Sequence, residues 1–162
     1  MRLSVAGIVA LAVAFAVVVR ADVPVPRFTR TEPVAGQPIV ADAGDGLVWQ
    51  GCVAGRTGSA CSGLVSPYTW EAALDYCQDL TWAGFTDWYL PNVTELASID
   101  DDTRVDPCAD PTAFPGTPSV GLWSSTSNAG LSCAWTIDFR FGDTRCRGKT
   151  GTYFVRCVRR GP

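Results

Sequence analysis

Seven cysteines constrain the fold of this chain more than any other feature of its sequence. They are spread over the C-terminal two thirds of the chain: Cys52, Cys61, Cys77, Cys108, Cys133, Cys146 and Cys157. In an oxidising compartment, such a set predicts a disulfide framework before it predicts metal ligands. Six cysteines can pair in fifteen ways, so their spacing alone does not choose the bridges. Because the number is odd, one thiol is left over or pairs with another chain.

The N-terminus predicts export into such a compartment. Arg2 precedes an uninterrupted apolar run from Val5 to Val19. This is the pattern of a cleavable secretory signal, residues 1–21, with cleavage between Ala21 and Asp22. The alternative is an uncleaved anchor helix, but the apolar run of about 15 residues is shorter than the roughly 20 that span a bilayer. We expect a secreted or periplasmic protein, or one at the cell surface, with no membrane span after cleavage.

Composition excludes several classes of function. The chain contains no histidine, which excludes Ser-His-Asp and Cys-His catalysis and histidine-bound metals. Two of the 13 Lys and Arg residues precede the predicted cut, which leaves 11 against 16 Asp and Glu and a net charge of −5. This mild acidity argues against a nucleic-acid partner. We therefore expect no enzyme, no cofactor and no bound metal.

About 141 residues follow the signal, enough for one domain with its own core. Residues 22–37 are rich in proline and predict an extended lead-in. The domain itself is expected over residues 38–160. It would begin with a hairpin from Pro38 to Gln50, because apolar residues flank a turn at residues 42–46.

Two helices are expected next. Thr69 can cap the first helix, whose apolar residues recur at helical spacing: Trp70, Ala73, Leu74, Cys77 and Leu80. Asn92 can cap the second, with Glu95 three residues later completing a capping box. Asn92-Val93-Thr94 is also formally a glycosylation sequon, and capping explains it without a sugar. An irregular loop rich in Asp and Pro then runs from Asp100 to Pro118.

The last third of the chain predicts strands. Apolar and polar residues alternate, with Trp135, Ile137, Phe139 and Phe141 on one face and Thr136, Asp138 and Arg140 on the other. This alternation indicates a strand with one buried and one solvent-facing side. Gly142-Asp143 would turn the chain back, and residues 153–158 would form the final strand.

Six short motifs in fixed order carry a resemblance to a known family. They are Gly46-Leu47-Val48-Trp49-Gln50 with Cys52, Tyr68-Thr69-Trp70-Glu71-Ala72-Ala73, Asp87-Trp88 with Leu90-Pro91-Asn92 and Glu95-Leu96, Ala113-Phe114-Pro115, Trp123-Ser124-Ser125-Thr126, and Tyr153-Phe154-Val155-Arg156-Cys157-Val158-Arg159. Together they resemble the Lcl C-terminal domain family of bacterial extracellular modules, from about Gly46 to Arg160. Tyr89 departs from the family pattern, which usually has Arg at this position.

The resemblance implies an α+β, C-type-lectin-like fold. In such a fold, two helices pack on small antiparallel sheets with long irregular loops, and disulfides staple the chain. It also implies the pairing Cys52–Cys61, Cys77–Cys157 and Cys133–Cys146, with Cys108 as the odd thiol. Closing the loop of about eighty residues between Cys77 and Cys157 would contribute about 4 kcal/mol in the chain-entropy model.

A basic C-terminal region is the expected ligand-binding site. Its residues would share the outward face of the last strands: Thr136, Asp138, Arg140, Asp143, Arg145, Arg147 and Lys149. Arginine suits bidentate recognition of sulfate, phosphate or carboxylate, and the resemblance implies adhesion to sulfated polysaccharides, a glycan-binding role. A protein ligand is an alternative. In another interpretation these arginines only solubilise an exposed sheet. Asp100, Asp101, Asp102, Asp106 and Asp110 could hold calcium, but consecutive loop aspartates are more often solvated.

Two further classes of function stay open. One is a structural subunit of an extracellular assembly, with Cys108 in an intermolecular contact. The other is an enzyme based on cysteines, as in the formylglycine-generating enzymes of related fold, or on the carboxylates of Glu71, Glu95 or Asp138. A free, reactive pair at Cys133 and Cys146 would favour the cysteine enzyme.

Overall fold

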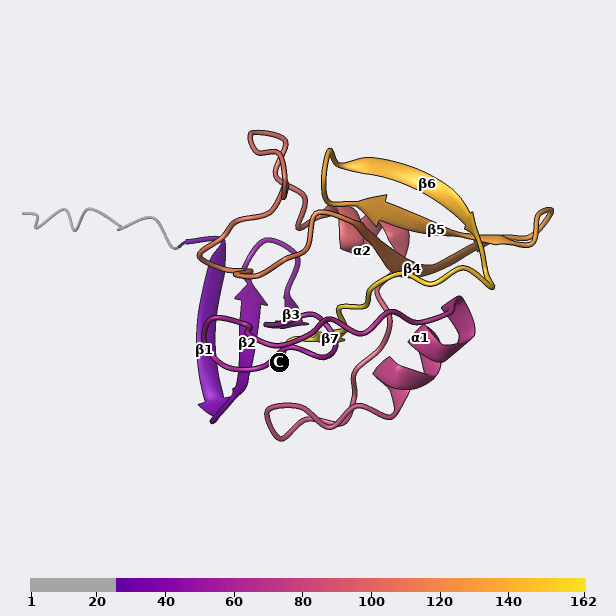
Figure 1. The fold of residues 1–162 in the computed structure, drawn as a ribbon. Coiled ribbons are helices and arrows are strands. Elements are labelled where there is room, and N and C mark those ends of the chain that lie inside the picture. Colours follow the sequence, from indigo (N-terminus) through magenta and orange to yellow (C-terminus); the bar gives the residue numbers. More distant parts are fainter. Residues whose placement is uncertain (1–25) are drawn as a thin grey trace, which may run out of the picture.

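This computed structural model describes residues 26–162 of the chain. They contain two small antiparallel sheets and two helices, joined by long irregular loops (Figure 1). The elements follow one another as β1 (Phe28–Val34), β2 (Gln37–Asp42), β3 (Leu47–Gln50), α1 (Trp70–Gln78), α2 (Val93–Ala97), β4 (Gly121–Asn128), β5 (Cys133–Asp138), β6 (Asp143–Gly148) and β7 (Val158–Arg160). The expected signal, residues 1–21, lies outside the described residues. The α+β class with two helices and small antiparallel sheets is confirmed.

The first sheet has the strand order β1-β2-β3-β7 and joins the two ends of the domain. Its β2–β3 pair is the predicted hairpin, with Asp42 opposite Leu47. β1 lies in the segment expected to be an extended lead-in. Residues 28–34 of this segment form an edge strand of the sheet, paired with β2. Phe28 explains this placement, because its ring packs edge-on against that of Phe114, with 5.1 Å between the ring centroids.

The second sheet is a meander with the order β4-β5-β6. β5 is shorter than expected: it ends at Asp138, and Gly142, at φ +77°, completes the turn into β6. Phe139 is buried in this turn whereas Phe141 is 60% exposed, so the predicted strand alternation does not continue to Phe141. The expected final strand also differs, since Tyr153 forms only an isolated bridge and β7 begins at Val158.

Both helices begin where the sequence predicts. The Thr69 side chain accepts a hydrogen bond from the backbone N–H of Ala72 and caps α1. The capping box of α2 is complete: Asn92 accepts from the N–H of Glu95, and Glu95 accepts from the N–H of Asn92, both at 2.9 Å. The Asn92 side chain is therefore engaged in capping.

Two strands of the second sheet, β4 and β5, are covered on both faces. Leu122 and Ile137 belong to one apolar cluster, which includes Leu96 of α2. Trp123 and Ala134 belong to a second cluster, which covers the opposite face. Adjacent residues of a strand point to opposite faces, so β4 and β5 contribute side chains to both clusters. This two-sided burial is why β5 does not show one solvent-facing side.

The three expected disulfides are confirmed. Cys52–Cys61 closes a loop of the first third, Cys77–Cys157 ties α1 to the segment before β7, and Cys133–Cys146 links β5 to β6. The free cysteine of the described chain is Cys108, as expected, but it is only 1% exposed. The expected intermolecular contact through Cys108 is therefore wrong for the folded domain, because its sulfur cannot reach another chain.

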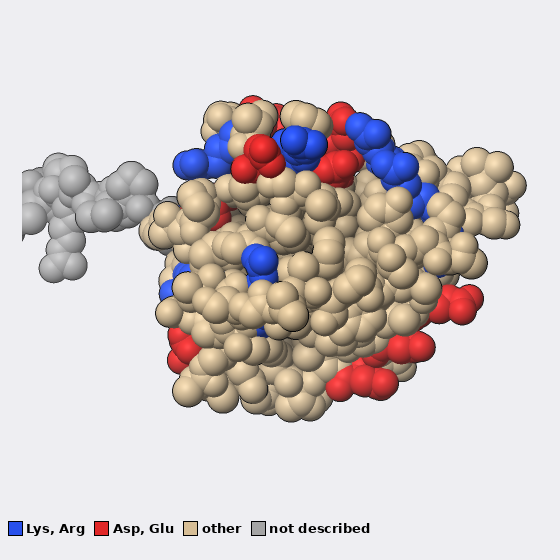
Figure 2. Space-filling model, in the orientation of Figure 1, with Lys and Arg blue, Asp and Glu red and all other residues tan. Residues whose placement is uncertain are grey.

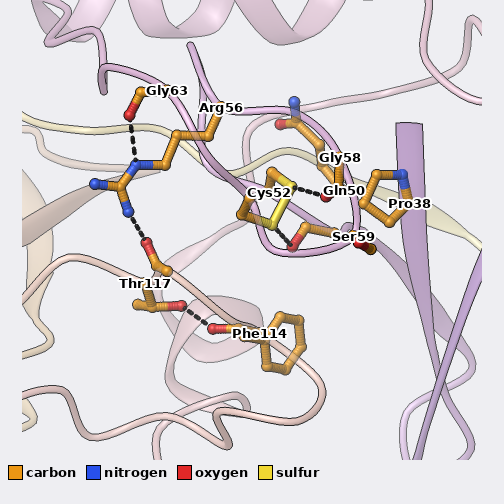
Figure 3. The surroundings of a disulfide bond; sticks show 12 residues. Pro38, Gln50, Cys52, Arg56, Gly58, Ser59, Gly63, Phe114 and Thr117 are labelled. Carbon is orange, nitrogen blue, oxygen red and sulfur yellow. Dashed lines mark hydrogen bonds between the residues drawn. A yellow bond between two sulfur atoms is a disulfide. The ribbon is translucent and has the colours of Figure 1, made fainter. Parts of the chain in front are cut away.

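Arginines, not carboxylates, bind the irregular loops to each other. Near the Cys52–Cys61 bridge, Arg56 donates to the carbonyl oxygens of Gly63 and Gly116 (Figure 3). Arg156 is fully buried and donates to Gln50 O at 2.8 Å and to Gly51 O at 3.0 Å. Guanidinium groups thus satisfy carbonyls that loops leave without strand partners.

Candidate anion-binding surface

Three of the predicted site residues form a continuous basic strip, which we call the β6 strip: Arg145, Arg147 and Lys149. Arg145 and Arg147 are two residues apart on β6 and share one face of the strand, and Lys149 follows directly after the strand. Figure 2 shows Lys and Arg along the border of the molecule where β6 runs, with Asp and Glu among them, whereas Asp and Glu without basic neighbours lie at the border over α1. The basic residues of this face therefore lie mainly on the β6 side, next to acidic ones.

Aromatic rings hold two members of the β6 strip. The Lys149 ammonium lies 4.0 Å from the centroid of the Trp70 ring, and the Arg147 guanidinium lies 5.8 Å from that of Tyr153. The Trp70 indole is fixed by its own hydrogen bond to Ser124 O, at 2.9 Å. Such cation–π contacts orient a cation without neutralising it.

Neither Arg147 nor Lys149 has a carboxylate within 4.0 Å among residues 26–162. Arg147 is half-buried, and its Nε is a buried donor with no hydrogen-bond acceptor. Two cations that are already oriented and have no carboxylate partner in the described chain are suited to binding an anion. Binding then costs little side-chain conformational entropy.

Arg145 differs from Arg147 and Lys149 because its guanidinium is already paired with a carboxylate. Its Nη2 donates to Asp143 Oδ2 at 2.7 Å, and this bond raises the pKa of the Arg145 guanidinium. Both side chains are about half exposed, so the pair is worth little to stability. Arg145 can exchange this partner for a ligand or another chain.

The turn between β5 and β6 carries the remaining predicted residues. Asp138 accepts a hydrogen bond from the backbone N–H of Arg140 at 3.0 Å, which gives the carboxylate a role in the turn. The Arg140 guanidinium lies 5.4 Å from the centroid of the exposed Phe141 ring, and Arg140 is itself exposed. Arg140 is thus a third cation without a carboxylate partner in the described chain, at the other end of β6.

The placement of Thr136 on the outward face is wrong. Thr136 is 1% exposed, and its hydroxyl donates to Arg145 O at 3.2 Å. The cause is the second apolar cluster, which covers this face of β5. Three arginines near the C-terminus also lie apart from the β6 strip: Arg156 is buried, Arg159 pairs with Asp87 at 2.7 Å, and Arg160 pairs with Glu95 at 3.3 Å.

Sequence reasoning missed the aromatic partners of the β6 strip. The helical pattern assigns Trp70 to the buried stripe of α1, and its ring does pack against the core, but it is only partly buried. Tyr153 belongs to the expected final strand. Its backbone pairs with that of Tyr68, and its ring lies beside β6. Short-range patterns give no signal for a contact between segments so far apart in the chain.

The acidic loop has internal partners instead of a common centre. Asp101 accepts from Thr103 and pairs with Arg104 at 2.7 Å, and the hydrogen bonds from Thr103 lower the pKa of Asp101. Within residues 26–162, no group of three or more Cys, Asp or Glu side chains could hold a metal ion.

The fold and its bridges define a small α+β domain stapled by three disulfides. The sequence comparisons identify its family: the family model described as the Lcl C-terminal domain matches residues 38–159, and the chain belongs to this family. The comparison with curated proteins returns no match. Among residues 26–162 no helix is long and apolar enough to cross a membrane.

Proposed function

We propose that this domain is an extracellular binding module that recognises an anionic polysaccharide, sulfated or carboxylated, through the β6 strip. The observation that carries the proposal is the pair Arg147 and Lys149, two cations held on aromatic rings without carboxylate partners among residues 26–162. A sulfated chain offers regularly spaced anions on a long, hydroxylated backbone. Arg147 can donate two parallel hydrogen bonds to one sulfate, and Lys149 can meet another as a point charge.

The proposal includes a C-type-lectin-like fold and export from the cell. The bridge between α1 and the end of the chain, together with the Cys133–Cys146 bridge just before it, supports the fold assignment. Three disulfides in a domain of this size are typical of secreted proteins and rare in a reducing cytoplasm. Membership of the Lcl C-terminal domain family supports an extracellular role as well.

Binding of the mature, oxidised domain to heparin and to a neutral dextran of similar length would test the proposal. We expect binding to heparin only, weakened by about tenfold or more between roughly 50 and 200 mM salt, as displaced counterions require. Arg147→Ala with Lys149→Ala should abolish most of this binding. Arg104→Ala is the matched control, because it removes a cation that is already paired with Asp101.

Two results would contradict the proposal. One is heparin binding that survives the double substitution in a domain with an unchanged circular dichroism spectrum. The other is equal binding to neutral dextran, which would show that recognition does not depend on the negative charge of the polysaccharide. If no acidic polysaccharide binds, a protein ligand becomes the better hypothesis for the same surface.

A further inference from the structure

The second sheet has one covered edge and one open edge. On the β4 side, Trp123 N donates to Phe154 O at 2.9 Å and Ser125 N donates to Pro91 O at 2.8 Å, so other segments close that edge. On the β6 side, the strand pairs only with β5 among the described residues. An open edge presents unpaired N–H and C=O groups to any strand that fits.

The hydrogen-bond pattern shows which groups face the open edge. Trp135 O accepts from the Ser124 hydroxyl on the β4 side at 2.8 Å, so it does not bond to Cys146, the residue opposite Trp135 on β6. Antiparallel pairs alternate between bonded and non-bonded positions. Cys146 and Thr144 therefore direct their N–H and C=O groups outward, while Arg145 directs its own toward β5.

The side chains on either side of Thr144, those of Asp143 and Arg145, carry opposite charges, so the strand edge is complementary in charge to a second copy of itself. If β6 pairs with β6 of a second copy about a two-fold axis at Thr144, Asp143 of each copy lies opposite Arg145 of the other. Both side chains are exposed, at 51% and 47%, and this non-bonded position brings side chains close together.

Charge selects this register over its neighbours. Sliding the second strand by two residues in one direction places Arg145 opposite Arg145, although it also places each Asp143 opposite Arg147. Sliding it in the other direction places Asp143 opposite Asp143. Like charges at directly opposite positions are unfavourable. Charged residues on an edge usually prevent edge-to-edge pairing, but of these three registers the one about Thr144 brings no like charges together.

We propose that the domain forms a two-fold homodimer in which two β6 strands pair antiparallel and make one continuous six-stranded sheet. The interface is isologous, with the same patch on both copies. If the proposed polysaccharide function is correct, the dimer carries two β6 strips on one continuous sheet.

Sedimentation velocity of the mature, disulfide-bonded chain over a wide range of concentration tests the dimer, with no polysaccharide present. We expect the sedimentation coefficient to rise with concentration for the natural sequence. Asp143→Arg and Arg145→Asp should each stay monomeric, because each creates two like-charge oppositions. A mixture of the two variants should associate again, since the two arginines of the first variant would face the two aspartates of the second.

The mixing experiment separates pairing between copies from effects within one chain. Each single variant loses its internal Asp143–Arg145 pair, so restored internal pairing cannot explain association of the mixture. Asp87→Arg is the control for reversing an exposed, paired carboxylate elsewhere, and it should leave the dimer intact. Thr144→Pro supplies an independent variant: it removes only an outward N–H, which edge strands tolerate, and should also abolish the dimer.

A natural sequence that stays monomeric throughout the range would overturn the proposal, as would a mixture that does not associate while both variants remain folded. Because the readout needs no ligand, loss of polysaccharide binding would leave this result untouched. A dimer without heparin binding would contradict only the proposed function.

Discussion

Replacing Arg156 with Met should destabilise the domain although it removes a buried, unpaired charge. The Arg156 guanidinium is fully buried, lies 4.8 Å from the centroid of the Phe114 ring, and has no carboxylate within 4.0 Å among the described residues. Desolvation, with a smaller contribution from the charge of Arg30, lowers the pKa of Arg156 to about 9. At pH 7 the group is still charged, so folding has to bury a cation.

The magnitude follows from the acceptors that Arg156→Met would leave behind. Gly51 O keeps a second donor, Arg30 Nη1 at 2.9 Å. Gln50 O and the Thr117 hydroxyl, which accepts from Arg156 at 2.9 Å, lose a charged hydrogen bond each. A hydrogen bond to a charged group contributes about 1.5–3 kcal/mol, and relief of the buried charge offsets part of the loss. We expect the free energy of unfolding to fall by about 2–4 kcal/mol.

Urea unfolding of the oxidised domain, followed by tryptophan fluorescence, would measure this difference as a lower midpoint at unchanged slope. Arg56→Met is the matched control. Arg56 also donates to two carbonyls, but these bonds are exposed, so the loss should stay below about 1 kcal/mol. An Arg156→Met variant within about 0.5 kcal/mol of the natural protein would refute the reasoning, since the buried carbonyls would then not depend on the guanidinium.

Three further predictions concern a hydroxyl group, a disulfide and a thiol. Tyr89→Phe removes the hydroxyl that donates to Glu95 at 3.0 Å and should cost about 1 kcal/mol in urea unfolding; no change would show that water replaces the phenol. Cys77→Ala with Cys157→Ala opens a loop of 80 residues and should cost about 4 kcal/mol; a loss below about 1 kcal/mol would contradict the chain-entropy argument. Burial raises the pKa of the Cys108 thiol to about 12, so a disulfide reagent at pH 8 should react with it only at the rate of unfolding. Fast reaction in the folded state would contradict its burial.

Local signals make much of the fold predictable. A cap residue followed by helical spacing is a short-range pattern, and Thr69 and Asn92 each begin a helix as expected. The cysteine pairing is different, because no local rule selects one of fifteen arrangements. It follows from the family resemblance, and the structure confirms all three bridges.

The predictions that failed depend on what covers a segment. Alternation along β5 implies one free face and so predicts an exposed Thr136, but a second apolar cluster covers that face. β1 is not recognisable as a strand because its four exposed C-terminal positions carry no apolar alternation. Backbone pairing with β2 and the packing of Phe28 hold it in place. Neither partner is visible from the segment itself.

Two groups among the arginines have different roles that the sequence does not distinguish. Arg30, Arg56 and Arg156 donate to loop carbonyls and stabilise the fold, whereas Arg145 and Arg147 lie on an open strand edge. Composition counts all of them alike as basic residues. The distinction arises only when the chain folds, because a guanidinium can serve as a hydrogen-bonding core residue wherever carbonyls converge.

The dimer and the polysaccharide site would depend on different members of the β6 strip, which predicts how salt acts on each. Pairing between copies uses Arg145 against Asp143, two adjacent opposite charges whose attraction is screened but whose backbone hydrogen bonds are not. Polysaccharide binding uses Arg147 and Lys149 against a polyanion, where counterion release makes the affinity fall steeply with salt. Two such sites on one dimer would bind a long chain more tightly than either alone. Raising salt should therefore release the polysaccharide at a concentration that leaves the dimer largely intact, and simultaneous loss of both would show that the polyanion itself holds the two copies together.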